Sequence, residues 1–275
     1  MTPRIAFAWP LLAVLVSTWL AGCTTTSTER VTPAPANESR DRVVSASDEP
    51  EGQKRALARM ELASAYFGRG QMNTALDNVK QAIAADPQYG EAYNLRGLIY
   101  ANIGENALAE ESFRRALQLN ARDADAMHNF GWYLCQQKRY PESMTMFTQA
   151  LAQTQYRGAS RTLLAQGVCQ AFAGNLVESE ISLVRSYELD PANPATATNL
   201  SEVLYRRGQY ERARFYVRRV NAQADVSNAQ TLWLAARIEN KLNNEQGTRE
   251  FGSQLRNRFP ESREAASYAR GALDD

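Results

Sequence analysis

The chain is poor in the residues from which metal sites are usually built. Of its 275 residues one is histidine, His128, and three are cysteine. Four ligands of these types therefore do not converge, and we expect no metal site and no cofactor. Lys and Arg together number 31 and Asp and Glu 30, so the chain has no basic excess of the kind that nucleic-acid binding needs. Hydrophobic residues make up 44%, which is enough to bury a core.

Common catalytic motifs are also lacking. The sequence has no G-x-S-x-G, no H-E-x-x-H and no glycine-rich phosphate-binding loop. His128 has no cysteine nucleophile or ligand set beside it in the sequence pattern, so we do not expect it to be catalytic. The chain is predicted to be neither an enzyme nor a binder of a small-molecule substrate.

The first 22 residues have the features of an export signal. Arg4 precedes an apolar run over residues 5–20, which ends in the tetrapeptide LAGC at Cys23. This ending resembles the processing site of bacterial lipoproteins, and the resemblance implies cleavage of residues 1–22 and acylation of Cys23, for example by palmitate. The alternative is an ordinary signal peptide with a chance cysteine. Thr24 stands where Asp usually marks inner-membrane retention, so we expect a lipid-anchored protein of the outer membrane that faces the periplasm.

Residues 23–53 are predicted to be an acylated cysteine followed by a flexible tether. They are rich in Thr, Ser, Pro and charge and have no sustained helical or strand period. A coil of this length spans on the order of 30 Å on average and about 100 Å when extended. The tether would keep a folded body near the membrane without fixing it there.

From residue 54 to residue 275 the chain repeats a helical pattern. The small residues Ala63, Gly97 and Gly131 are spaced 34 residues apart, and Gly167 follows after 36, which places a two-residue insertion near residues 155–159. This period resembles the tetratricopeptide (TPR) repeat, in which two antiparallel helices cross at small residues. The predicted repeats lie near 56–89, 90–123, 124–157, 160–193, 194–227 and 228–261, with a cap at 262–275. The fold class is therefore all-α: a TPR superhelix, or α-solenoid, of about six repeats with a capping helix.

A partner-binding groove is predicted on the concave face of the stack. In TPR proteins positions 2, 5, 9, 12 and 13 of each first helix line that face, and apolar residues there are not needed for packing between repeats. Such a surface suits an amphipathic helix or an extended peptide. Alternatively, the tether covers the part in the first repeat. The predicted groove residues are Leu57, Met60, Ser64, Phe67, Asn94, Leu98, His128, Trp132, Leu164 and Val168.

The other two cysteines, Cys135 and Cys169, lie at similar heights on the first helices of the third and fourth repeats. An oxidising compartment favours a disulfide where Cα atoms come within about 4.4–6.8 Å. Facing positions on neighbouring helices satisfy that distance. Two buried free thiols are the alternative, because free cysteine is a common core residue.

The combination of the LAGC site with these repeats resembles the type IV pilus biogenesis and stability lipoproteins, the PilF/PilW pilotin family. The segments that carry the resemblance include ELASAYFGRGQMNTALDNVKQAIAADP, FGWYLCQQKRYPESMTMF and SYELDPANPATATNLSEVLYRRGQYERARFYV. The resemblance implies a scaffold that binds the pilus secretin and promotes its outer-membrane localisation and multimerisation. An alternative is a TPR lipoprotein adaptor for outer-membrane protein insertion or for recruitment of cell-wall hydrolases. Which secretin segment binds, and the oligomeric state, do not follow from the sequence.

Overall fold

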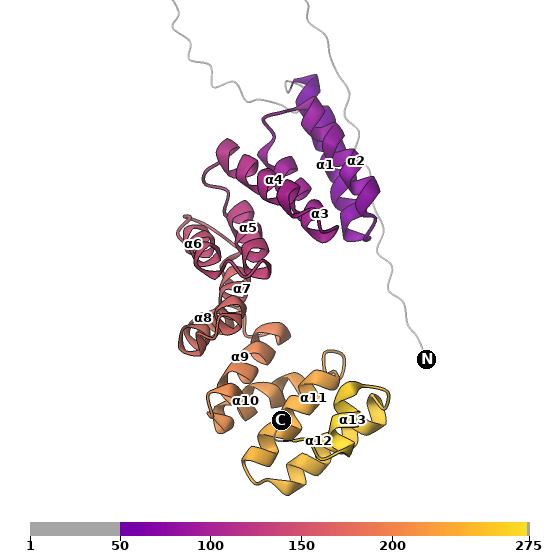
Figure 1. Ribbon diagram of the computed structural model, residues 1–275, viewed down its shortest axis with the longest axis vertical. Coiled ribbons are helices and arrows are strands. Elements are labelled where there is room, and N and C mark those ends of the chain that lie inside the picture. Colours follow the sequence, from indigo (N-terminus) through magenta and orange to yellow (C-terminus); the bar gives the residue numbers. More distant parts are fainter. Residues whose placement is uncertain (1–49, 274–275) are drawn as a thin grey trace, which may run out of the picture. The chain divides into compact units, whose positions relative to one another are not determined.

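A computed structural model describes residues 50–273 of the chain, and those residues contain helices, turns and no strand. The predicted signal peptide, Cys23 and most of the tether lie outside the described residues. Thirteen helices follow one another along the described part of the chain (Figure 1). They are α1 (Glu51–Gly68), α2 (Met72–Ala85), α3 (Gly90–Asn102), α4 (Asn106–Leu119), α5 (Ala124–Gln136), α6 (Tyr140–Leu151), α7 (Ala159–Phe172), α8 (Leu176–Leu189), α9 (Pro194–Arg206), α10 (Tyr210–Asn221), α11 (Ala229–Lys241), α12 (Glu245–Arg258) and α13 (Arg263–Ala269).

The helices α1 to α12 pair into six helix–turn–helix units. Each odd-numbered helix packs on the even-numbered helix that follows it, and it also contacts the odd-numbered helix of the next unit. The odd-numbered helices thus form one continuous row, which is the arrangement that a TPR stack requires. The final helix, α13, packs against α11 and α12 and covers the last unit. The predicted fold class is confirmed.

Small residues allow the two helices of a unit to approach closely. A Cβ atom built on Gly97 would lie 2.7 Å from the ring of Phe113, which is fully buried on α4. The crossing in the third unit is also joined by a hydrogen bond, because the buried hydroxyl of Ser143 donates to the carbonyl of Gly131 over 2.7 Å. Serine therefore serves at these crossings as a small residue whose one polar group is satisfied by the facing backbone.

The turn between the helices of a unit needs a residue with positive φ. Glycine fills that position in four units, and the structure shows Lys138 (φ 59°) and Asn243 (φ 57°) in the other two. Asparagine tolerates this conformation better than most residues, whereas lysine adopts it at a cost. The turn is thus imposed by the packing of the repeat even where the sequence has no glycine.

The first helix begins earlier than the sequence analysis predicted. Helix α1 starts at Glu51, inside the stretch 23–53 that was assigned to the tether. Pro50 occupies the position before the helix, and the acidic Glu51 in the first turn interacts favourably with the helix dipole. Proline and acidic residues are common in flexible tethers, but they are also common at the start of a helix. Composition alone therefore places the boundary between tether and first helix too late in the chain.

Candidate functional site

An open depression of about 420 Å³ lies across the first three units. Met60 of α1 and Leu95 and Leu98 of α3 provide its apolar lining. Asn94 is also in the lining, and its side-chain oxygen accepts a hydrogen bond from Asn129 of α5 over 3.1 Å. Three of the predicted groove residues, Met60, Asn94 and Leu98, therefore line one recess.

The rim of this depression is acidic. Glu91 in the first turn of α3 and Asp123 and Asp125 at the start of α5 all line it. The side chain of Asp123 also caps α5 by accepting a hydrogen bond from the backbone nitrogen of Ala126. Asp125 forms a 2.5 Å ion pair with Arg161 of α7, but both side chains are more than half exposed, so that pair is weak. The depression thus combines an apolar floor with negative charge.

Sequence reasoning did not assign Glu91 and Asp123 to the site. Each stands at a helix N-terminus, where an acidic residue is favoured by capping and by the helix dipole. In the sequence these residues therefore have a sufficient structural explanation. Only the packing of α1, α3 and α5 shows that they also face the same recess.

The remaining predicted groove residues of the first unit are divided between surface and core. Leu57 is 42% exposed and lines a smaller recess of about 200 Å³ with Tyr89, while Ser64 is exposed. Burial, together with the nearby charge of Glu91, raises the pKa of Tyr89 to about 12. Phe67 packs partly buried against the core of the first two units. A charge at Phe67 would therefore disturb the fold as well as the surface.

The structure corrects the assignment of His128 to the groove. Its side chain is 7% exposed, and its Nδ1 lies 2.8 Å from Oγ1 of Thr162, which is fully buried. The hydroxyl of Tyr156, in the two-residue insertion, lies 2.8 Å from the same Oγ1. The insertion thus supplies a tyrosine that shares Thr162 with the histidine, and the low exposure of His128 leaves it little surface for a partner.

The groove residues of the third and fourth units are also partly enclosed. Trp132 packs beside the buried cluster that contains Cys135 and Cys169. Leu164 packs against the hydrophobic core that the helices from α8 onward form. Val168 is half-buried. These three residues lie on the same row of helices as Met60 and Leu98, but none of them lines the acidic depression.

Cys135 of α5 and Cys169 of α7 form a disulfide with their Cα atoms 5.8 Å apart. Both residues are buried. The bond joins the first helices of the third and fourth units, on either side of the two-residue insertion. It therefore stabilises the junction at which the repeat spacing is irregular.

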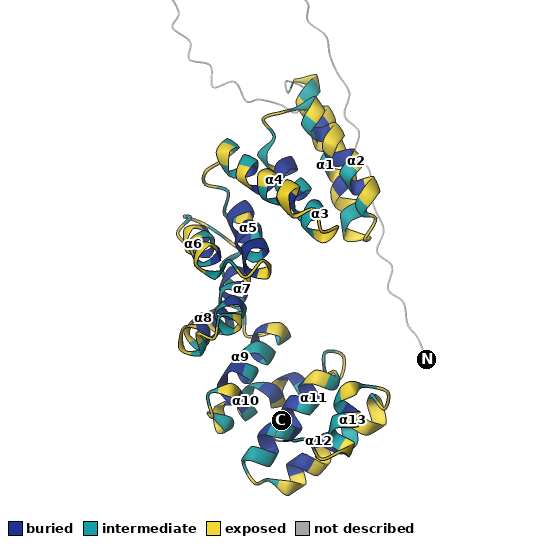
Figure 2. Ribbon diagram, in the orientation of Figure 1, coloured by how far each residue is buried: buried dark blue, intermediate teal, exposed yellow. Residues whose placement is uncertain are grey.

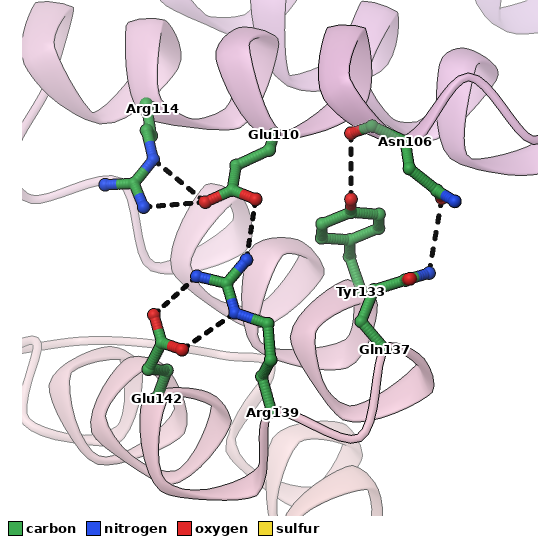
Figure 3. Close-up of polar contacts among 7 residues, drawn as sticks. All are labelled: Asn106, Glu110, Arg114, Tyr133, Gln137, Arg139 and Glu142. Carbon is green, nitrogen blue, oxygen red and sulfur yellow. Dashed lines mark hydrogen bonds and ion pairs between the residues drawn. The ribbon is translucent and has the colours of Figure 1, made fainter.

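A network of ion pairs joins the second and third units (Figure 3). Glu110 of α4 accepts hydrogen bonds from Arg114 of its own helix and from Arg139 at the start of α6, each over 2.6 Å. Arg139 donates in turn to Glu142. The hydrogen bond from Arg139 is the main cause that lowers the pKa of Glu110 below its usual value. Alongside, the hydroxyl of Tyr133 donates to the carbonyl of Asn106.

No group of three or more His, Cys, Asp or Glu side chains within residues 50–273 is arranged to hold a metal ion. In the same range, no helix is long and apolar enough to cross a membrane. The geometry of the described part of the chain is that of a helical-repeat protein with an open recess on its row of first helices. Such a recess is suited to holding a segment of another protein.

Comparison with known proteins gives the class of this fold. Tetratricopeptide-repeat family models match residues 60–126 and 124–152. A crystal structure of PilW, described as a widely conserved type IV pilus biogenesis factor, superposes with a TM-score of 0.73 and 30% identity, over 78% of this chain and 98% of PilW. The structure of Pseudomonas aeruginosa PilF gives a TM-score of 0.72 at 25% identity, over 81% of this chain and 100% of that one.

The sequence comparison agrees with the structural one. The chain is 26% identical to the type IV pilus assembly protein PilF of Pseudomonas aeruginosa over 268 residues, which is 98% of both chains. The chain belongs to the PilF/PilW family of type IV pilus biogenesis TPR proteins. The family membership expected from the sequence is confirmed.

Proposed function

We propose that this protein is an outer-membrane lipoprotein scaffold, a pilotin, which binds the type IV pilus secretin and promotes its localisation and multimerisation. The observation that carries the proposal is the acidic recess with an apolar floor, in a chain whose relatives act in type IV pilus biogenesis. The lipoprotein-like sequence around Cys23 supports the membrane anchor. In this proposal the protein works by binding and carries out no catalysis.

The recess accounts for how a partner would be held. An apolar side chain of the secretin would lie against Met60 and Leu98, and basic residues beside it would face Glu91 and Asp123. Burying one apolar anchor in the recess provides affinity, while the charges select the orientation. The secretin segment is thus expected to combine an apolar residue with Lys or Arg.

Affinity capture from an envelope extract with the mature, acylated chain tests this function. Met60→Glu should reduce secretin capture at least tenfold, because it places a charge among the apolar residues that line the recess. The matched control is Leu108→Glu on α4, an exposed apolar residue that does not line the recess. Because Met60 also packs partly buried against the core of the first two units, the comparison requires that circular dichroism shows the same helix content and urea unfolding the same midpoint for both variants.

Two results would count against the proposal. Equal capture by the Met60→Glu and Leu108→Glu chains would show that the recess is not the binding site. Capture of a cell-wall hydrolase or of the outer-membrane insertion machinery in place of the secretin would favour an adaptor role instead.

A further inference from the structure

Two amide side chains at the acidic recess use only part of their capacity for hydrogen bonds. Asn129 of α5 donates through Nδ2 to Oδ1 of Asn94 on α3. Within residues 50–273 neither Nδ2 of Asn94 nor Oδ1 of Asn129 has a hydrogen-bond partner, and neither atom is fully buried. Most of α5 is buried (Figure 2), but Asn129, like Asn94, is half-buried. The pair therefore offers a free donor and a free acceptor to a bound molecule.

Packing between the units does not require an amide at the position of Asn94. The same position in the first, fourth and sixth units is occupied by apolar residues, which are Met60, Leu164 and Leu232. The hydrogen bond between the two amides joins α3 to α5, but it uses one donor of Asn129 and the acceptor of Asn94. A purely structural role thus leaves the remaining polar atoms of the pair without an explanation.

Each of the two helices carries an acid, an amide and an apolar residue on successive turns. On α3 these are Glu91, Asn94 and Leu98. On α5 they are Asp125, Asn129 and Trp132. Residues three or four apart lie on one face of a helix, and α3 packs directly against α5. The two amides thus lie at one level, between an acidic level and an apolar level.

The acidic level keeps a negative charge. Asp125 is paired with Arg161 of α7. Glu91 accepts a hydrogen bond from the hydroxyl of Tyr89, and Asp123 accepts one from a backbone nitrogen, so neither contact neutralises the carboxylate. Among the described residues, no Lys or Arg lines the recess. Basic side chains of a partner are therefore favoured on this side of the amides.

We propose that the recess binds a segment of its partner in an extended conformation, with the main chain of the segment held by Asn94 and Asn129. An extended segment has unpaired N–H and C=O groups along its edge, which match the free acceptor of Asn129 and the free donor of Asn94. Its side chains alternate between two directions. Where the segment crosses the helices at the level of the amides, one set of side chains points toward Glu91 and Asp123 and the other toward Leu98. The recognised sequence therefore alternates Lys or Arg with apolar residues.

The amides select an extended segment over an amphipathic helix. A helix pairs its main-chain groups internally, so it would cover Asn94 and Asn129 without offering them a main-chain partner. Covering a polar group that lacks a hydrogen bond costs free energy. Packed helices lie about 8–10 Å apart, so the path from α1 over α3 to α5 is about 16–20 Å long, which is about five or six extended residues.

This inference rests on the proposed function, because it describes how the same recess holds its partner. Selection from a random library of linear peptides of about twelve residues, by the mature acylated chain, tests the binding mode without assuming a particular partner. The enriched peptides should alternate basic and apolar residues.

Asn94→Leu and Asn129→Leu should each weaken binding of the enriched peptide about tenfold, because each removes a hydrogen bond at a covered site. Asn102→Leu is the matched control. Asn102 is an exposed amide on the same helix as Asn94 and does not line the recess. Its replacement should leave the affinity unchanged.

A second measurement alters the peptide and leaves the protein intact. Replacing one main-chain amide of the peptide with an ester removes an N–H group and keeps the shape of the chain. An ester at the residue that donates to Asn129 should weaken binding to the natural chain about tenfold. The same ester should have no effect on binding to the Asn129→Leu chain, because that interaction is already lost.

Three results would overturn the proposal: enriched peptides with apolar residues three and four apart, as in a helix; binding that tolerates an ester at every position; or a library that yields no binding peptide. A chain that selects alternating peptides through Asn94 and Asn129 but captures no secretin keeps this proposal and fails the proposed function alone.

Discussion

Individual residues set the distance between the two helices of each unit. At Gly97 the absence of a side chain lets the ring of Phe113 lie against the backbone of α3, and Gly131 has the same relation to Phe147. Because these aromatic rings are fully buried, they have little space into which to move. The glycines at these two crossings are therefore required by packing and not by backbone conformation.

Replacing Gly97 with Ala is expected to lower the free energy of unfolding by about 1–3 kcal/mol, because the new Cβ would overlap Phe113. Gly68→Ala is the control, since nothing lies within 4 Å of the Cβ built there. Urea unfolding followed by circular dichroism measures both. A Gly97→Ala chain as stable as the Gly68→Ala chain would contradict the packing argument.

The buried histidine makes stability depend on pH. Burial, aided by the charge of Arg161, lowers the pKa of His128 from 6.5 to about 4. The unfolded chain therefore binds a proton below about pH 6.5 that the folded chain does not bind until about pH 4. The stability that neutral His128 contributes is complete above pH 6.5 and is lost as the pH falls toward 4.

We expect His128→Gln to reduce the loss of stability between pH 7 and pH 5 by about 1–2 kcal/mol. Urea unfolding of both chains at the two pH values is the measurement. Parallel losses in the two chains would show that other groups carry the pH dependence.

At the scale of the helices, the junctions between units are held by different means. The disulfide joins α5 to α7, and the ion pairs of Glu110 join α4 to α6. A glutamate at the same position of the fourth unit, Glu180, pairs with Arg207 and Arg212 of the fifth. Neighbouring units are thus connected by specific contacts in addition to apolar packing.

Breaking the disulfide should destabilise the stack. The bond closes a loop of 34 residues, for which chain entropy predicts a contribution of about 2–4 kcal/mol. A reducing agent should lower the urea midpoint of the natural chain and leave that of the Cys135→Ser, Cys169→Ser chain unchanged. Alkylation of both cysteines in native, unreduced protein, seen by mass spectrometry, would disprove the bond.

The ion pairs of Glu110 are expected to contribute less than the disulfide. Glu110→Gln should lower the free energy of unfolding by about 1 kcal/mol, because Arg139 and Arg114 lose the charged partner that they share. Glu111→Gln is the control, since that carboxylate is 68% exposed and lies 3.7 Å from Arg96. Equal unfolding curves for the two variants would show that the network contributes nothing measurable.

For the whole molecule, the proposed function requires the folded body to stay at the membrane. Cys135 and Cys169 are bonded, so Cys23 is the cysteine available for acylation. We expect Cys23→Ser to abolish incorporation of radiolabelled palmitate and to release the protein from the membrane fraction. Undiminished label in this variant would remove the basis for the proposed anchor.

The sequence by itself determined the repeat, its approximate boundaries and the family. A period of 34 residues with small residues at fixed positions follows directly from the geometry of two crossing helices. The repeat can therefore be recognised in a single sequence, without an alignment to other proteins. Residues that pack within one unit, such as Gly97 with Phe113, lie close together in the sequence and are therefore predictable from it.

Tertiary structure decided which residues a partner can reach. The exposure of a side chain depends on the neighbouring unit, which lies about 34 residues away and is displaced by the insertion near Tyr156. His128 has a groove position in the pattern, yet it is buried and its ring lies within hydrogen-bond distance of Thr162 of the next unit. Glu91 and Asp123 look like ordinary helix starts until α1, α3 and α5 bring them to one recess. Periodicity assigns a residue to a face of its own helix, but only the packing between units leaves that face open or covers it.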